Sequence, residues 1–159
     1  VNTAREMHQA CLSSLPADIA ICAAAVADWY VLNAATQKQK KQNHVQPQIE
    51  LAKNPDILAS LSQATSRPPL VIGFAAETEH LIRHAKDKLA KKKCDWIIAN
   101  HISDDPSSSV FGSDQNKASL LKGVDIIDWP YQSKQALAER LIVEIDQWIK
   151  AYDHSTKTK

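Results

Sequence analysis

Glycine is scarce in this chain, with only three residues, at positions 73, 112 and 123. Phosphate-binding loops of the G-x-G-x-x-G and Walker types need closely spaced glycines, because the backbone must approach the phosphates. Three glycines so far apart cannot form either loop, which argues against a dehydrogenase-like dinucleotide fold. A nucleotide bound by this chain would have to be held by other groups.

The chain also lacks a strong charge of one sign, a membrane-length apolar run and a metal-type cysteine spacing. The formal net charge is +1 over 159 residues, so we expect no broad basic surface for nucleic acid, and any anion site must come from local clustering. No apolar run is long enough to cross a bilayer and no signal peptide opens the chain, so we expect no membrane association. The three cysteines, Cys11, Cys22 and Cys94, have no ligand spacing and suit free thiols in a reducing cytoplasm.

What the chain does have is an apolar run over residues 18–30, D-I-A-I-C-A-A-A-V-A-D-W-Y, which stops at Asp28. Such a run is typical of a strand buried on both faces of a parallel sheet, and we predict a strand over Ile19–Ala27. In open α/β sheets, ligands bind beyond the carboxyl ends of these strands. Asp28 would stand at that end, where it could cap the next turn or contact a sugar hydroxyl or Mg²⁺.

Helical and apolar segments alternate along the rest of the chain, which predicts an α/β fold. We expect a Rossmann-like, three-layer, mostly parallel sheet flanked by helices, with a C-terminal β-hairpin, in a single domain over residues 1–152. The predicted elements are a helix over 1–15, a strand over 19–27, a helix from Asn54, a strand over 70–74, a helix over 79–93, a strand over 96–99, a hairpin over 118–127 and a helix over 133–152. Residues 153–159 are expected to be a frayed tail.

A long polar segment, residues 29–53, interrupts this alternation after the first strand. It carries the basic block K-Q-K-K at 38–41 and becomes apolar again only at Ile49. We predict a two-stranded arm that closes on residues 49–51. The lysines could be an ordinary solvated charge run, or the arm could be a flap that closes over a polyphosphate.

Two further features suit an anion. Lys88 and Lys92 lie beside the apolar stripe of the predicted helix over 79–93, whereas a purely solvated lysine face would lie opposite it. The lysines could simply complement the helix dipole, or they could hold a phosphate near the sheet.

The segment Asn54–Leu58 has the pattern of a capped helix start, with Asn54 as the N-cap. A helix start also offers free N–H donors, which could bind an anion.

Several motifs occur in the order found in one family. They are A-A-A-V-A-D-W at 23–29, K-Q-K-K at 38–41, K-N-P-D-I-L at 53–58, G-F-A-A-E-T at 73–78, the lysine helix, D-W-I-I-A-N at 95–100 and F-G-S-D-x-N at 111–116. Together they closely resemble phosphopantothenoylcysteine synthetase of the CTP type. In bacteria this enzyme is commonly the C-terminal part of a bifunctional coenzyme A biosynthesis flavoprotein. The resemblance covers nearly the whole chain.

The resemblance implies a ligase that activates 4′-phosphopantothenate with CTP as an acyl-cytidylate and couples it to cysteine, releasing CMP and pyrophosphate. It implies Mg²⁺ as a cofactor, no flavin in this chain and a cytoplasmic location. Lys38 would be the flap lysine with a catalytic role, and Asp28 would contact the nucleotide or the metal. The CTP-binding positions implied by the resemblance are Ala24, Asp28, Lys38, Pro55, Asp56, Ile57, Leu58, Phe74, Lys88 and Lys92.

The sequence departs from the family at its start. The family's N-terminal portion carries a glycine-containing nucleotide-fold motif, a substrate-binding Asn and a Ser/Gly-rich stretch, none of which precedes Val1. We therefore expect a fragment that binds CTP but is weak or inactive as a ligase. The family is dimeric, and the arm over residues 29–53 is expected to pair two subunits. The alternative is a nucleotide- or nucleic-acid-binding module without chemistry.

Overall fold

The computed structural model describes residues 1–34, 37, 48–77, 79–101 and 115–157. Lys38 and the rest of the K-Q-K-K block, together with most of the F-G-S-D-x-N motif, lie outside these residues. The helices are α1 (Ala4–Ser13), α2 (Ile57–Ser62), α3 (Leu81–Lys92) and α4 (Lys134–Lys157). The strands are β1 (Ile19–Cys22), β2 (Trp29–Val31), β3 (Leu51–Lys53), β4 (Leu70–Glu77), β5 (Trp96–His101), β6 (Gln115–Lys122) and β7 (Asp125–Ser133).

Within the described residues, five strands form one mixed sheet in the order β1-β4-β5-β6-β7. The pairs β1–β4 and β4–β5 are parallel, and β6 and β7 continue the sheet as an antiparallel hairpin. Gly123 turns that hairpin with a φ of 60°, a conformation that favours glycine. The predicted α/β class and C-terminal hairpin are confirmed.

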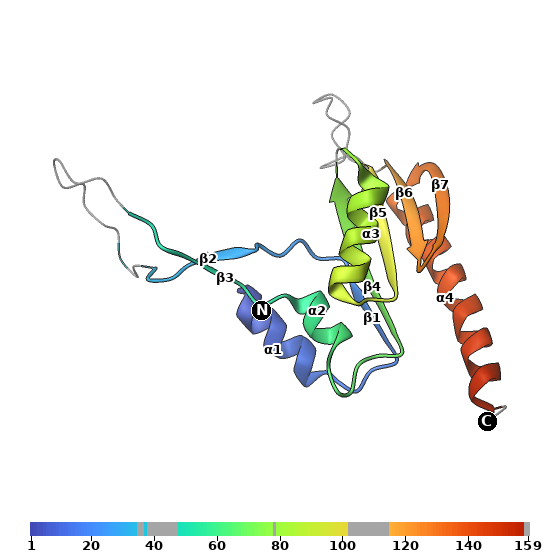
Figure 1. Ribbon diagram of the computed structural model, residues 1–159, viewed down its shortest axis with the longest axis horizontal. Coiled ribbons are helices and arrows are strands. Elements are labelled where there is room, and N and C mark those ends of the chain that lie inside the picture. The colour runs from blue at the N-terminus through green and yellow to red at the C-terminus, as the bar shows by residue number, and fades with distance from the viewer. Residues whose placement is uncertain (35–36, 38–47, 78, 102–114, 158–159) are drawn as a thin grey trace.

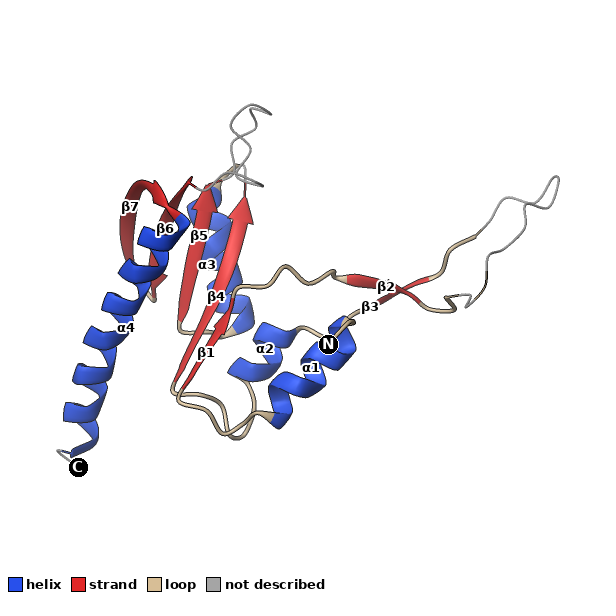
Figure 2. Cartoon of the chain, turned by 180° about the vertical axis from the view of Figure 1, so that it is seen from behind, coloured by secondary structure: helices blue, strands red, loops and turns tan. Residues whose placement is uncertain are grey.

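Helices cover both faces of the sheet, which gives the expected three layers (Figures 1 and 2). On one face, α4 packs through Leu137, Leu141 and Ile145 against a core that includes Trp96 and Trp129. On the other face, α2 and α3 pack on the apolar side chains of β4 and β5. Residues spaced by three and four positions provide these contacts, as amphipathic periodicity requires.

The first strand differs from its prediction. β1 ends at Cys22, not at Ala27, because it pairs with β4 only as far as Gly73, and residues 23–25 are exposed. It is also an edge strand, with Ile21 46% exposed, and not a strand covered on both faces. Asp28 therefore lies well beyond the strand end, just before β2.

Three helix boundaries also differ from the sequence predictions. The α2 N-cap is Asp56, whose carboxylate accepts a hydrogen bond from Ala59 N, so Asn54 is left for another role. The helix α3 begins after His80, which has a positive φ. The helix α4 continues to Lys157, so residues 153–157, which were expected to belong to the tail, are helical.

Strands β2 and β3 pair as a separate antiparallel ribbon, which extends away from the sheet (Figure 2). The predicted two-stranded arrangement is present. One face of the ribbon turns toward α1, where the Arg5 guanidinium lies 4.0 Å from the centroid of the Tyr30 ring. The other face carries Trp29, Val31 and Leu51, which are 50%, 43% and 56% exposed.

Candidate functional site

The candidate site lies where the chain leaves the sheet after β1 and returns to it through α2. Strand β1 stops at Cys22, so β4 beyond Gly73 has no strand partner on that side among the described residues. The side chain of Lys88 fills part of this gap, because its Nζ donates a 2.8 Å hydrogen bond to the Phe74 carbonyl oxygen. This contact brings the lysine helix to the open edge of the sheet.

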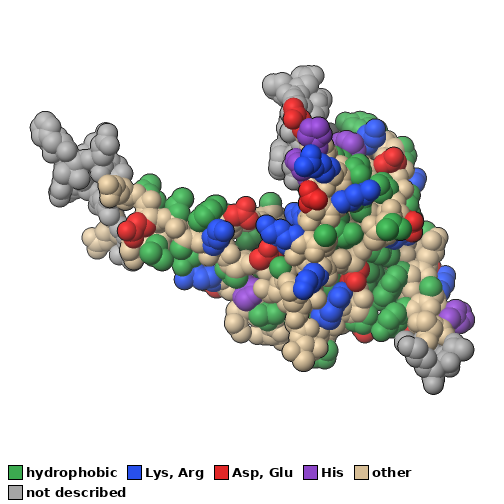
Figure 3. All heavy atoms as spheres, viewed as in Figure 1, with side chains coloured by type: hydrophobic (Ala, Val, Ile, Leu, Met, Phe, Trp, Pro, Cys, Tyr) green, Lys and Arg blue, Asp and Glu red, His purple; other side chains and the backbone are tan. Residues whose placement is uncertain are grey.

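Lys92, one turn further along α3, reaches the start of α2. Its Nζ forms an ion pair and a hydrogen bond with the Asp56 carboxylate. Lys88 and Lys92 are both half-buried, so their ammonium groups are directed by the packing of α3 on the sheet. On the face shown in Figure 3, Lys and Arg side chains gather over α3 and where the ribbon meets the body.

The Asp56 carboxyl group responds to these contacts. Burial alone would raise its pKa, but the hydrogen bonds from Lys92 and Ala59 N and the charges of Lys92 and Lys88 together lower the pKa below its usual value. The folded protein therefore favours the carboxylate form of Asp56. The ionised Asp56 carboxylate partly neutralises the positive charge of Lys88 and Lys92.

The lowered pKa predicts a pH-dependent contribution to stability. A carboxyl group with a lower pKa in the folded state stabilises the protein above its unfolded-state pKa of about 4, and this contribution is lost as the pH falls through the folded-state value. We expect Asp56→Asn, which keeps an N-cap, to lower the free energy of unfolding by at most about 1 kcal/mol at pH 7, since the pair is partly exposed. The deficit should shrink below about pH 4 in urea titrations.

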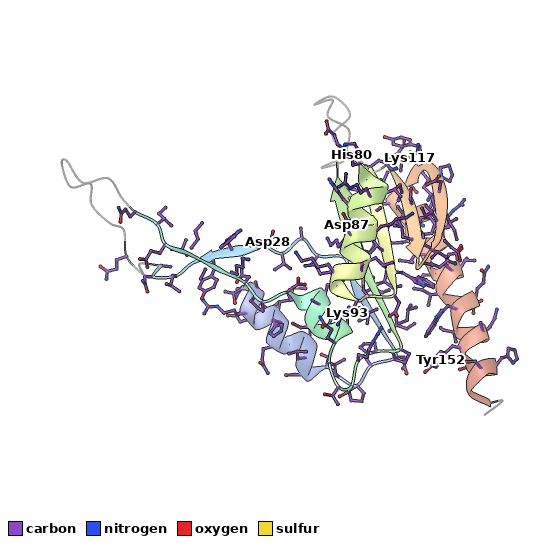
Figure 4. The ribbon with its side chains drawn as sticks, viewed as in Figure 1. Asp28, His80, Asp87, Lys93, Lys117 and Tyr152 are labelled. Carbon is purple, nitrogen blue, oxygen red and sulfur yellow. The ribbon has the colours of Figure 1, made fainter. Side chains whose placement is uncertain are left out.

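Asp87→Asn, on the exposed side of α3, is the matched control (Figure 4). A deficit in Asp56→Asn that stays constant from pH 7 to pH 3.5 would contradict the assigned charge interaction.

Asn54 connects the segment around Asp28 to the start of α2, although the sequence pattern identified it only as a helix cap. Its side-chain Nδ2 donates a 2.9 Å hydrogen bond to Ala27 O, and its backbone N–H donates a 2.8 Å hydrogen bond to Asp28 O. These bonds fix the segment around Asp28 against the start of α2. The Asp28 carboxylate is exposed and makes no hydrogen bond or ion pair with another described residue.

We predict that Asn54→Ala loosens this connection, because Ala27 O loses its side-chain donor while the backbone bond to Asp28 remains. Amide hydrogen exchange in residues 27–31 should become faster, with little change in the sheet. Asn33→Ala, which removes a 3.4 Å contact with Glu50 on the ribbon, is the control. Unchanged exchange in residues 27–31 of Asn54→Ala would show that the side chain does not hold the segment.

The structure brings most of the predicted site residues into this region. Ile57 and Leu58 are buried on α2, and Leu58 packs against Gly73 of β4. The residues joined by the contacts above, or lying on α2 or just before it, are Asp28, Pro55, Asp56, Ile57, Leu58, Phe74, Lys88 and Lys92. Phe74 takes part through its carbonyl oxygen, because its side chain packs in the core that α4 covers. Ala24 is exposed beyond the end of β1, and Lys38 lies outside the described residues.

The described residues offer no protein cage for a metal ion. No group of three or more His, Cys, Asp and Glu side chains lies close enough together in this part of the chain to hold one. One exposed carboxylate, Asp28, fits an Mg²⁺ ion that takes its other ligands from phosphates and water. Burial raises the pKa of the Cys22 and Cys94 thiols to about 11, so neither thiol is ionised at neutral pH.

Two open cavities lie apart from this site. A cavity of about 470 Å³ is lined mainly by the end of α3, including Lys93, and by the β6–β7 turn. A second cavity, of about 350 Å³, lies beside Pro16 and Arg67. The candidate site itself is a surface formed by α2, α3 and the open edge of β4. No described helix is both long and apolar enough to cross a membrane.

The fold and the lysine pair define an α/β domain with a cationic site beside the carboxyl end of an edge strand. Residues 1–149 match the family described as DNA/pantothenate metabolism flavoprotein C-terminal domain, and the chain belongs to this family. The predicted family resemblance is confirmed.

Similar proteins agree with this membership. The chain is 40% identical over 146 residues to the coenzyme A biosynthesis bifunctional protein CoaBC of Haemophilus influenzae, and 35% identical over 162 residues to CoaBC of Escherichia coli K12. These alignments cover 91% and 99% of this chain but only 36% and 38% of the relatives. A crystal structure of the C-terminal domain of a CoaBC protein superposes with a TM-score of 0.72 at 25% identity, covering 95% of this chain and 65% of that one.

Proposed function

We propose that this chain is the nucleotide-binding part of a ligase that couples 4′-phosphopantothenate to cysteine at the expense of CTP. The observation that supports this most directly is the meeting of Lys88, Lys92 and the α2 start at the open edge of β4. Two ammonium groups held side by side suit a polyphosphate, and a helix start offers N–H donors to a base edge. The relatives named above are coenzyme A biosynthesis proteins.

The reaction has two steps. A carboxylate oxygen of 4′-phosphopantothenate attacks the α-phosphorus of CTP, the bond to the β-phosphate oxygen breaks, and pyrophosphate leaves. The amine of cysteine then attacks the acyl carbon, loses a proton and displaces CMP, which forms the amide. Negative charge accumulates on the phosphates in the first step, and preorganised cations stabilise such charge.

Each proposed residue has a role in this scheme. Lys88 and Lys92 hold the outer phosphates, and binding exchanges their present contacts with Phe74 O and Asp56 for phosphate oxygens. Backbone groups of residues 55–58 read the cytosine, while Phe74 packs on the nucleotide. Ala24 approaches the nucleotide with its backbone. Lys38 closes over the triphosphate.

Asp28 is the residue that would hold Mg²⁺ together with the phosphates. The ion would supply further neutralisation of phosphate charge. The chain itself orients the triphosphate through its two lysines and Asn54, which fixes the Asp28 segment.

Calorimetric titrations with CTP, ATP and a short oligonucleotide, each with Mg²⁺, test this proposal. CTP should bind in clear preference to ATP, and the oligonucleotide should bind weakly. If CTP and ATP bind with equal affinity, or if neither binds, the proposed CTP specificity is contradicted. Preferred binding of the oligonucleotide would favour the alternative, a nucleic-acid-binding module.

We also propose that a second copy of the chain covers the exposed face of the ribbon. Trp29, Val31 and Leu51 form a contiguous apolar strip there, because residues opposite each other in the ribbon share a face. We expect Val31→Asp to convert a dimer into a monomer in sedimentation experiments. Val124→Asp, at a 90% exposed hairpin position, should leave the dimer intact. A monomeric wild-type protein would refute the proposed pairing.

A further inference from the structure

The cavity of about 470 Å³ at the carboxyl end of α3 lies apart from the lysine site and has no role in the proposed reaction. Lys86, Leu89 and Lys93 line it from α3 and its C-cap, and Val124 lines it from the β6–β7 turn. Its volume lies within the range of about 300–1,000 Å³ that is usual for small-molecule sites. The cavity is therefore large enough for a small molecule.

The two lysines of the cavity lie on one side of α3. Seven residues of an α-helix make nearly two turns and advance by roughly 10 Å, so Lys86 and Lys93 project in similar directions. Leu89 and Ala90, three and four positions after Lys86, lie between them on the same face. This face therefore has an ammonium group at each end and an apolar centre.

The rest of the cavity wall is uncharged. Cys94 is only 8% exposed, and burial raises the pKa of its thiol to about 11, so the thiol is protonated at neutral pH. Val124 is 90% exposed at the tip of the β6–β7 hairpin. A single exposed valine needs no explanation, but Val124 extends the apolar surface of Leu89, Ala90 and Cys94. These four side chains form an apolar floor that suits an aliphatic chain.

The lysines of the cavity have no ionic partner in the described part of the chain. Neither ammonium group forms an ion pair or a hydrogen bond with another described residue, and no described Asp or Glu lines the cavity. Lys88 and Lys92, at the lysine site on the same helix, are by contrast both paired. The ammonium groups of Lys86 and Lys93 therefore favour the binding of an anion.

The backbone of Lys93 gives a second indication. Lys93 caps α3 in the left-handed conformation, with a φ of 57° and a ψ of 29°. Glycine is the usual residue at such a helix end, because a Cβ atom makes this conformation unfavourable. A lysine here carries a conformational cost, and it places an ammonium group at the cavity. Backbone strain of this kind is often found at binding sites.

We propose that this cavity is a binding site for a small amphipathic carboxylate. Its aliphatic chain lies on the apolar floor, and the ammonium groups of Lys86 and Lys93 hold its carboxylate. The flexible four-carbon stems of the two lysines allow both ammonium groups to reach one carboxylate between them. A phosphate ion would use the lysines but leave the apolar floor uncovered. The site does not depend on the proposed ligase function.

The test is calorimetric titration of the wild-type protein with octanoate and hexanoate, and with octyltrimethylammonium as a cationic probe of the same chain length. A fully buried methylene group strengthens binding by about fourfold, and on this open surface we expect about twofold. Octanoate should therefore bind about fourfold more tightly than hexanoate, and about tenfold more tightly than octyltrimethylammonium. Amide NMR shifts should change in residues 86–94 and 123–124.

Lys93→Gly removes the ammonium group and supplies the residue that the left-handed conformation favours. It should weaken octanoate binding by about threefold to fivefold, with a melting temperature equal to that of wild type or higher. Lys86→Gln is the second variant and should weaken octanoate by a similar factor. Lys91→Gln, an exposed position of the same helix that does not line the cavity, is the matched control and should change the affinity little.

Octanoate binding that is absent, or equal in wild type, Lys86→Gln and Lys93→Gly, would overturn the site. Equal binding of octanoate and octyltrimethylammonium would also overturn it, because the lysines would then have no part in selecting an anion. Inorganic phosphate that binds more tightly than octanoate would show a plain anion site instead. None of these measurements uses CTP, so their outcome is independent of the proposed ligase function.

Discussion

Replacing Lys88 by alanine is expected to weaken CTP binding by about tenfold to a hundredfold, with little effect on CMP. A charge-assisted hydrogen bond contributes about 1.5–3 kcal/mol, and each 1.4 kcal/mol is about a factor of ten in affinity. The selectivity arises because the Lys88 ammonium is held beside Phe74 O, where we place the outer phosphates. Calorimetric titration with CTP and with CMP measures the two losses of affinity.

The matched control is Lys91→Ala, on the exposed side of the same helix. It removes the same charge without removing a contact at the site. We therefore expect only a slight loss of affinity, of similar size for CTP and CMP. Equal losses for CTP and CMP in Lys88→Ala would show that the lysine does not contact the outer phosphates.

The second large effect is expected at Gly73, where β4 passes directly beneath α2. A Cβ atom at this position would lie 2.5 Å from Leu58 Cδ2 and 2.9 Å from Ile97 Cδ1, closer than side chains can approach. We expect Gly73→Val to lower the free energy of unfolding by roughly 1–3 kcal/mol, because α2 must move or the core must repack. Urea denaturation measures this loss.

The same substitution should impair the site, because a displaced α2 would move Asp56 away from Lys92. Ala76→Val, at an exposed position of the same strand, is the control and should leave stability nearly unchanged. A Gly73→Val protein as stable as wild type would mean that α2 is not packed on β4 as closely as described.

The periodic parts of the chain were predictable from sequence because local pattern and tertiary environment agree there. The stripe of Leu137, Leu141 and Ile145 predicts a helix that faces a core, and α4 buries these residues. The apolar runs at 70–74 and 96–99 predict buried strands, and the structure confirms both. The position of Lys88 and Lys92 beside the apolar stripe also predicted their approach to the sheet.

The ends of these elements were not predictable, because where a strand ends depends on the strand that pairs with it. Residues 23–27 are as apolar as those of β1, but a strand needs a partner, and the pairing of β1 with β4 stops at Cys22 and Gly73. The dual role of Asn54 was also hidden, since its bonds to Ala27 and Asp28 join segments that are remote in sequence. A capping residue and a tertiary connector have the same sequence pattern.

Three buried amide atoms find no hydrogen-bond partner within the described part of the chain, and the sequence could not indicate them for a related reason. They are Oδ1 of Asn100, Oδ1 of Asn116 and Nε2 of Gln132. In the sequence, Asn100 and Asn116 are single letters of two longer motifs, and nothing around Gln132 marks it. A sequence gives no sign that amides from three strands share one face until the register is known. Asparagine and glutamine are mostly surface residues, so burial without partners is visible only in the structure.

Hydrogen exchange with and without CTP and Mg²⁺ tests the proposed binding of CTP between α2 and α3 at the open edge of β4. We expect slower exchange in residues 54–61 and in the carboxyl half of β4, and no change in the β6–β7 turn beside Lys93. Protection confined to that turn, or no protection at α2 and β4 at saturating CTP, would contradict CTP binding at this site.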